Sequence, residues 1–408
     1  MPNPVTYPGQ KSFLSAGVEA TQGTAVVPTA TLPVVSFAPQ DAPSWIEDMA
    51  LYGDMAVLHG LQQGGLHTEW DLNSYWFGDY SPMFLHNIMG DLTEDGTYTG
   101  SGTTTLSSQA NAGATTITVA LSLTSGTVVA IGAGGTHPEV RTLTSTGTSP
   151  TFAVPLLYTH AAAEVVRPVQ APFTHVESLL NTAQAQPGSL TLIDWQGLTP
   201  TTQARAYTGC AFSDLTIKGV AESEFITVTG RGLGWPSAAA ATLPVASATP
   251  ATPLSSWRAL LGFGGPASGG TQVKIVSEFE LSLARTLKAY TTMQGSQAPY
   301  WIQRGGLRCT GRVLIPVPND ETYFNYMINN TQPQLQFVIG NGLAGASLLS
   351  LQVDIKNLGV KGAVIQKQEA IGYELTWEAV AASVTNAGPS GGRTPVSFTT
   401  QNAVSQAY

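Results

Sequence analysis

The stretch Gly64-Gly-Leu-His-Thr-Glu-Trp-Asp-Leu-Asn-Ser-Tyr-Trp76 decides the fold class of this chain. From Leu66 onward, large or readily buried side chains occupy the even positions, whereas His67, Glu69 and Asp71 occupy odd positions. Alternation with a period of two is typical of a strand with one face in a core and one face in water. We therefore predict an amphipathic β-strand over this stretch.

A short helix is predicted directly after this strand, over Ser81–Gly90. Ser81 is a residue type that caps helix N-termini, and Pro82 suits the first helical position. Apolar side chains between Phe84 and Met89 then recur at helical spacing. The first unit is thus a strand followed by a helix with one apolar stripe.

A similar unit lies far downstream. Residues 305–316 begin with the same Gly-Gly-Leu sequence and also alternate between apolar and polar side chains. Pro318 then precedes a second helical segment, in which apolar side chains from Tyr323 to Ile328 share one stripe. We interpret the two units as an internal pseudo-repeat. A chance similarity between two strand–helix units is the alternative.

Composition and charge narrow the classes of function. The chain has 408 residues, which is long enough for a large core, and only 11% of them are charged, against about a quarter in an average protein. The formal net charge is −9. Proteins that bind nucleic acid tightly through charge are basic, so that class is disfavoured. The low charge fits a β-rich protein or one whose surface is covered by copies of itself.

The residues that carry enzyme chemistry form no convincing constellation. Residues 388–392 match the nucleophile-elbow pattern by letters, but no helix follows them in this glycine-rich tail. His67, Glu69 and Asp71 share one strand face and could touch a metal, although a solvated face is the simpler interpretation. We predict no enzyme activity, no metal and no cofactor. Cys210 and Cys309 are expected to be single buried thiols, with a disulfide open only if their strands adjoin.

The remaining segments suggest a division of the chain. Residues 39–63 have no clean period and are predicted to form a long irregular loop. Between 101 and 163 short strand patterns alternate with turns, and Glu139 and Arg141 are the only charged residues. The predicted organisation is an N-terminal arm and first strands (1–35), the first part of a host domain (36–100), an inserted small all-β domain (101–170), the second part of the host domain (171–384), and a tail (385–408) that is either disordered or an arm on a neighbour.

Taken together, the order of these weak motifs resembles the tail tube proteins, or major tail proteins, of long non-contractile-tailed bacteriophages. Residues 19–28 resemble the opening strand and turn of that family. Its first half is similar to 32–37 followed by the first Gly-Gly-Leu unit, its middle to 173–232, and its second half to the second Gly-Gly-Leu unit. The resemblance covers about 14–100 and 171–384, and no single motif is diagnostic.

This resemblance implies a mainly β fold: a sandwich or barrel protomer with short flanking helices, plus the inserted domain. It also implies that hexameric rings stack into a hollow tube, in which phage DNA passes through the lumen during ejection without specific binding. Partners would be further copies of the chain and the tape measure, terminator and baseplate proteins. The location would be the virion tail, assembled in the host bacterial cytoplasm.

The first residues do not form a signal peptide, and no apolar run approaches about 18 residues, so no membrane association is expected. Two other classes of function stay open. One is a tail component that forms a single ring, such as a terminator or baseplate hub. The other is a secreted β-rich adhesin, which the serine- and threonine-rich segment permits and the missing signal peptide disfavours.

Two sets of site residues follow from the tube hypothesis. Acidic side chains on the exposed strand faces are expected to line the lumen, with the outer wall as the alternative. The loop 39–63 and its counterpart 285–304 are expected to contact the next ring, with packing inside the protomer as the alternative. The insertion is expected to project outward. The lumen candidates are Glu69 and Asp71, with Glu278 and Glu280 as weaker ones, and the ring-contact candidates are Trp45, Met49, Leu51, Trp301 and Ile302.

Overall fold

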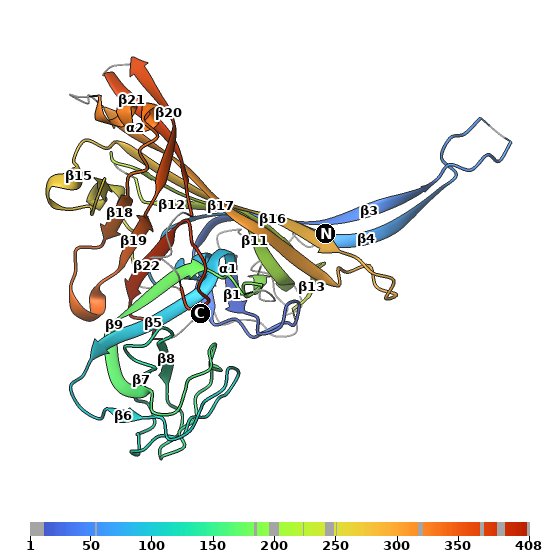
Figure 1. Ribbon diagram of the computed structural model, residues 1–408. Coiled ribbons are helices and arrows are strands. Elements are labelled where there is room, and N and C mark those ends of the chain that lie inside the picture. Colours follow the sequence, from blue (N-terminus) through green and yellow to red (C-terminus); the bar gives the residue numbers. More distant parts are fainter. Residues whose placement is uncertain are drawn as a thin grey trace, which may run out of the picture.

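Two antiparallel β-sheets face each other across one large core, as Figure 1 shows for the computed structural model. The mainly β sandwich with two short helices confirms the predicted fold class. The structure describes residues 12–53, 55–182, 186–195, 204–222, 224–240, 249, 251–316, 321–367, 371–381 and 388–405.

The first sheet contains a continuous run of strands that we call the main sheet, in the order β3-β4-β12-β11-β16-β17-β21-β20. The N-terminal part of β11 leaves this run and pairs instead with β10 and β13, while β10 continues to β1 and β2. The strand bounds are β1 Phe13–Val18, β2 Ala30–Leu32, β3 Val34–Asp48, β4 Gly60–Tyr75, β10 Leu190–Trp195, β11 Ala204–Val220, β12 Thr227–Gly234, β13 Ala238–Ala239, β16 Glu278–Tyr290, β17 Trp301–Pro316, β20 Leu358–Lys367 and β21 Ile371–Ala379.

The second sheet closes the other side of the core, in the order β15-β14-β18-β19-β22-β9-β7-β8, with β5 and β6 also paired to β9. Strand β22 comes from the C-terminal tail and lies between β19 and β9. The expectation of a disordered or partner-bound tail is therefore wrong for residues 388–405. The bounds are β5 Gly90–Tyr98, β6 Thr104–Thr105, β7 Val128–Ile131, β8 Glu139–Thr142, β9 Val165–Leu179, β14 Leu260–Phe263, β15 Gln272–Val273, β18 Leu335–Gly340, β19 Ser350–Ile355 and β22 Ser397–Asn402.

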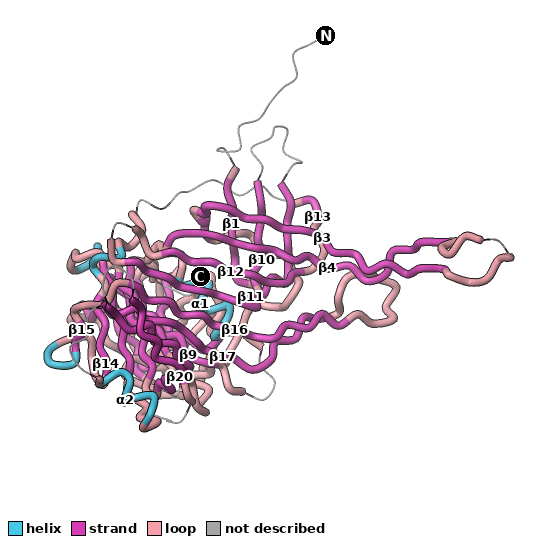
Figure 2. The backbone as a smooth tube through the Cα atoms, turned by 90° about the horizontal axis from the view of Figure 1, so that it is seen from above, coloured by secondary structure: helices cyan, strands magenta, loops and turns pink. Residues whose placement is uncertain are grey.

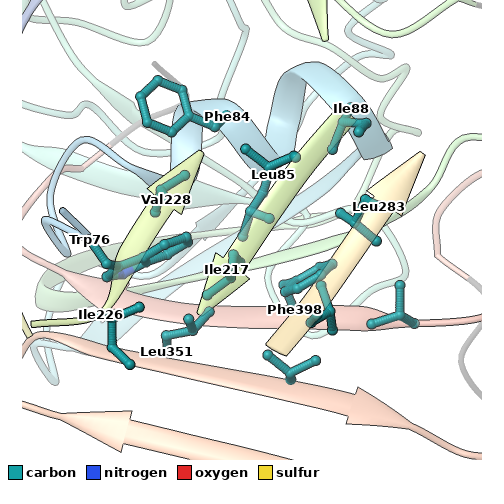
Figure 3. Packing of buried hydrophobic residues seen from close by; sticks show 14 of the residues in the cluster. Trp76, Phe84, Leu85, Ile88, Ile217, Ile226, Val228, Leu283, Leu351 and Phe398 are labelled. Atoms are coloured by element: carbon teal, nitrogen blue, oxygen red, sulfur yellow. The ribbon is translucent and has the colours of Figure 1, made fainter. Parts of the chain in front are cut away.

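The core is built from the alternating apolar faces of both sheets (Figure 3). Phe279 of the main sheet stacks on Phe337 of the second sheet with ring centroids 4.3 Å apart. Burial of side chains of this size contributes about 1.5–3 kcal/mol each, so the alternating pattern fixes which face of every strand turns inward. The free thiols of Cys210 and Cys309 are buried in this core.

Both predicted helices form, but the first differs in detail. Helix α1 (Pro82–Met89) is buried on all sides, not along one stripe. Ser81 does not cap it, because its hydroxyl accepts a hydrogen bond from the Phe77 amide instead. The guanidinium groups of Arg285 and Arg304 bind carbonyl oxygens in the last turn of α1, where cations suit the helix dipole. The second helix is α2 (Thr322–Ile328), and short 3₁₀ turns are η2 (Ser256–Arg258), η3 (Gly269–Thr271) and η4 (Gly345–Ser347).

The predicted irregular loop at 39–63 is instead the outer part of a long β-hairpin. Strands β3 and β4 pair from their base out to Asp48 and Gly60, and the hairpin projects far from the body in Figures 1 and 2. Segment 285–304 likewise belongs to the hairpin β16–β17. The sequence of this segment shows no strand-like alternation of apolar and polar residues, because prolines and a β-bulge interrupt it along β3.

The segment between β5 and β9 has its own buried cluster, which runs from Leu106 to Val166 and lies apart from the main core. Its two ends continue into β5 and β9, which pair with each other, so the chain leaves and re-enters the host sheet at adjacent strands. This arrangement supports an insertion, and the boundaries 101 and 170 stay a prediction. Among the described residues, no helix is long and apolar enough to cross a membrane.

Candidate assembly surfaces

The four predicted lumen residues lie on one surface, which we call the polar face of the main sheet. Strand pairing places Asp71 opposite Arg231, and Glu280 opposite Arg312. The neighbours of these residues along each strand, such as Trp70, point into the core. Glu69, Asp71, Glu278 and Glu280 therefore share the side of the sheet that faces away from the core.

Ion pairs cover much of this polar face. The Asp71 carboxylate lies 2.9 Å from the Arg231 guanidinium, and the Glu278 carboxylate lies 3.0 Å from the Lys218 ammonium. Arg312 contacts the carboxylates of Glu278, Glu280 and Glu374. The expected acidic surface is thus a mixed one in which acids and bases alternate. The sequence already placed Arg308 and Arg312 beside the acidic candidates of the second unit, but it gave no indication of Arg231 and Lys218, which lie on other strands.

One carboxylate on the polar face is strongly perturbed. Hydrogen bonds from Arg308 and then from Lys361 lower the pKa of Glu378 to about 2. The same contact raises the pKa of Arg308. Both groups therefore stay charged at neutral pH and hold each other on the surface.

The possible metal site is not assembled. The nearest ring nitrogen of His67 lies 3.4 Å from the Glu69 carboxylate, and Asp71 pairs with Arg231 instead. Within the described ranges, no group of three or more His, Cys, Asp or Glu side chains could hold a metal ion. The simpler interpretation of a solvated face fits this geometry.

The second surface is the end of the β3–β4 hairpin, residues 49–53 and 55–59, which we call the hairpin tip. Its backbone is ordered by its own contacts: Asp48 accepts hydrogen bonds from the Ala50 amide and the Tyr52 hydroxyl, and the Tyr52 ring lies 4.4 Å from the His59 ring. The Leu51 side chain is 101% exposed. Other exposed apolar side chains on or beside the tip are Trp45, Ile46, Met49, Tyr52, Met55, Val57, Leu58 and Leu61.

The shorter hairpin supplies only one of its two predicted contact residues. Trp301 is partly exposed and stacks on Tyr290 with ring centroids 4.9 Å apart. Ile302 is 0% exposed, and its backbone exchanges two hydrogen bonds with the Gln22 side chain. The prediction is therefore wrong for Ile302, because alternation along β17 turns this residue into the protomer.

A third feature was missed by the sequence-based interpretation. Glu139 and Arg141, the only charged residues between 101 and 163, are both buried. Arg141 bridges Glu139 and Glu94 of strand β5, at 2.9 Å from the latter. Burial opposes a charge on His160, but Glu139 and Glu164 outweigh it and raise the pKa of this imidazole. A charged cluster thus fastens the insertion to the host sheet.

Comparison with known proteins bears on these surfaces. The family described as "Phage tail tube protein" matches residues 9–379, which is nearly the whole chain. The chain belongs to the phage tail tube protein family. No curated protein matches the chain.

Membership of this family indicates the general role of the protein. A tail tube protein is a structural subunit of the virion tail, so the family indicates a role that is not enzymatic. It also implies self-assembly into a tube and association with other tail components. Such an assembly needs surfaces that are exposed in the protomer and covered in the tube. The apolar hairpin tip is exposed in the protomer, as such a surface has to be before assembly.

Proposed function

We propose that this tail tube protein forms rings that stack into the hollow tube of a long non-contractile tail, and that phage DNA crosses this tube during ejection. The observation that carries the proposal is the hairpin tip, where a large apolar surface extends beyond the protomer body. Large exposed apolar patches on a soluble protein mark sites where another molecule binds. A neighbouring ring is the partner that would cover it.

The two sets of site residues have separate tasks in this proposal. Trp45, Met49 and Leu51 contact the next ring along the tube, with Trp301 at the edge of that contact. The polar face of the main sheet lines the lumen. Most of its bases are held by carboxylates, so few free cations remain to bind the phosphates of passing DNA.

The ring in this proposal closes through the edges of the main sheet. Joining edge strands would remove the unpaired backbone groups that make open edges prone to aggregation. The resemblance implies six protomers in each ring around the lumen. Assembly takes place in the host cytoplasm, and the tape measure, terminator and baseplate proteins bind the finished tube. The insertion projects away from the tube wall.

Shortening the hairpin tip tests the proposal. A variant in which an Asn-Gly turn replaces residues 49–59 keeps the paired strands, Trp45 included, and removes the exposed apolar side chains of the tip itself. We expect folded rings or protomers and no long tubes when purified protein is concentrated and viewed by negative-stain electron microscopy. Long tubes from this variant would contradict the assigned role of the tip.

Point variants separate surface chemistry from the loss of chain. Leu51→Asp places a charge on the tip, and Leu121→Asp places one on an exposed apolar residue of the insertion. Only Leu51→Asp should suppress tube growth, because its side chain would be buried in the contact. Single rings from the unmodified chain at every concentration would favour a terminator or hub over a tube.

A further inference from the structure

The main sheet consists of two halves with the same topology. The first half contains β3, β4, β11 and β12, and their order in space is first, second, fourth, third. The second half contains β16, β17, β20 and β21 in the same spatial order. A helix follows the second strand of each half, α1 after β4 and α2 after β17. The pseudo-repeat therefore extends to four strands and a helix.

Irregularities in the pairing coincide between the halves. In β3–β4 the register shifts between Pro43 and Trp45, opposite the Gly64-Gly65 pair. In β16–β17 it shifts between Arg285 and Leu287, opposite Gly305-Gly306. Both Gly-Gly pairs thus sit at a bulge of the same strand pair. Bulges are specific local features, so equal placement in both hairpins argues against chance similarity.

A second pair of bulges matches in the same way. The register between β11 and β12 shifts between Phe212 and Asp214. The register between β20 and β21 shifts between Val360 and Gly362. When the halves are superposed through their strand partners, these two shifts fall at the same position. The third strand of each half is therefore bent at the same place.

Both halves hold one tryptophan side chain between their second and fourth strands. In the first half, Trp70 on β4 lies against Gly232 on β12, where an added Cβ would be 2.2 Å from the indole ring. In the second half, Gly311 on β17 lies against Trp377 on β21, where it would be 2.1 Å. Each half therefore holds one indole at this site. The second strand supplies it in the first half and the fourth strand supplies it in the second half.

The two halves are joined inside the chain, and this joint shows how one half meets the next. Strand β11, the third of the first half, pairs antiparallel with β16, the first of the second half. Thr216 lies opposite Ser282 there, and their hydroxyl oxygens are 2.8 Å apart. The strands that correspond to β11 and β16 in the other halves, β20 and β3, lie at the two outer edges of the main sheet. Among the described strands, β20 pairs with β21 alone and β3 with β4 alone.

We propose that β20 of one copy pairs antiparallel with β3 of the next copy in the register of the β11–β16 joint, and that three chains close the ring. The proposal rests on the proposed function. In this ring, the two halves of three chains take the six positions that the resemblance assigns to six chains. The matching bulges set the register, which places Val364 opposite the neighbour's Gln40. Val364 and Ile365 are exposed in the protomer and would be covered by this joint.

The prolines of β3 fit a joint that forms only between correctly placed copies. Pro39 and Pro43 lack a backbone N–H, so this edge offers fewer hydrogen bonds than β16 does. Edges of that kind resist pairing with arbitrary strands. Side chains of β20, such as Val364 and Ile365, then help to distinguish β3 of the next copy from other strands.

The dimensions of a closed sheet also favour three chains. Strands about 4.8 Å apart give three copies of an eight-stranded sheet a backbone diameter of about 37 Å, or about 48 Å with a tilt of about 40°. That width admits one DNA duplex after inward side chains are subtracted. Six chains would give about 73 to 96 Å, which is far wider than one duplex needs.

Cysteine cross-linking of the full chain tests both the β20–β3 joint and the number of chains in the ring. Gln40→Cys combined with Val364→Cys places two thiols at the proposed contact, while the native Cys210 and Cys309 are buried. Tubes are formed under reducing conditions, to verify assembly, and are then oxidised and analysed by denaturing electrophoresis without reductant. We expect a ladder that ends at three chains. The control combines Gln40→Cys with Leu343→Cys, an exposed residue in the connection between β18 and β19, and should give no ladder.

Each outcome decides a separate statement. A ladder that ends at six chains would overturn the three-chain ring. Tubes that form without any cross-link would overturn the β20–β3 joint. Failure of the unmodified chain to form tubes would contradict the proposed function, and cross-linking of its soluble oligomers would still decide the joint and the count.

Discussion

The two halves of the main sheet share a frame and differ in what they carry. The first hairpin ends in a long apolar tip, whereas the second turns back within residues 291–300. After the helix, β5 and β9 are connected by residues 99–164, which include most of the predicted insertion, whereas β18 and β19 are connected by residues 341–349 alone. The additions lie at turns, where chain can be inserted without disturbing strand register.

This contrast shows which features the frame needs. Bulge positions and the indole site are equal in both halves, although the residues that supply them differ. The tip and the insertion occur only in the first half. We conclude that the repeated features hold the sheet together, and that the unrepeated ones serve contacts specific to one half. Substitutions in each class should therefore have different effects.

The largest effect is expected where the insertion meets the host sheet. Arg141→Met leaves the carboxylates of Glu94 and Glu139 buried without their shared cation. Breaking a buried ion pair in this way costs about 3–5 kcal/mol. Chemical denaturation should show that loss in the free energy of unfolding. The control is Arg308→Met on the exposed polar face, and an equal loss from both variants would remove the distinction between joint and surface.

A smaller effect is expected at the shared indole site. Gly311→Ala places a Cβ 2.1 Å from the Trp377 ring and 2.3 Å from the Glu280 carbonyl oxygen, and overpacking of a core costs about 1–3 kcal/mol. Gly232→Ala should destabilise the first half by a similar amount. Gly270→Ala, in the turn η3 and outside the repeated features, has no neighbour within 4 Å and serves as the control in the same denaturation experiment. A neutral Gly311→Ala would show that the two sites are not equivalent.

The charged joint should also make stability depend on pH. Burial opposes a charge on His160 and His175, but neighbouring carboxylates outweigh it and raise the pKa of both imidazoles in the folded protein. A raised folded pKa adds stability that is complete below the unfolded value of about 6.5 and is lost as the pH rises through the folded value. The free energy of unfolding should therefore fall above about pH 6.5. His160→Gln should reduce this slope, and an unchanged slope would contradict the assignment.

The smallest effect is expected on the polar face. Glu378→Gln removes the carboxylate that pairs with Arg308 and Lys361, and exposed pairs contribute about 0–1 kcal/mol. The pKa of Glu378 is lowered to about 2, so its contribution is present above about pH 4.5 and is lost toward pH 2. In this variant the free energy of unfolding should depend less on pH within that window, and it should change little at pH 7. A loss of several kcal/mol at pH 7 would show that the polar face is structural.

Particular residues show how far the sequence could predict this structure. The alternation around Trp70 identified β4 and its buried face, and the second Gly-Gly-Leu identified β17. The same alternation failed along β3, where prolines and a bulge disrupt it, and a long hairpin was interpreted as a loop. Ile302 was assigned to the ring contact as part of segment 285–304, the counterpart of loop 39–63, although its side chain is buried within the protomer.

The sequence by itself determined the β-rich class, the two strand–helix units, the acidic candidates on one strand face and the resemblance to tail tube proteins, because local periodicity and residue order carry that information. The tertiary structure alone decided which bases neutralise those acids, that Glu139 and Arg141 are buried, that the tail supplies β22, and that the repeat spans four strands in each half. These properties depend on which strands pair with one another, in several cases across more than a hundred positions, as between Asp71 and Arg231, and a single sequence contains no local signal for such pairing.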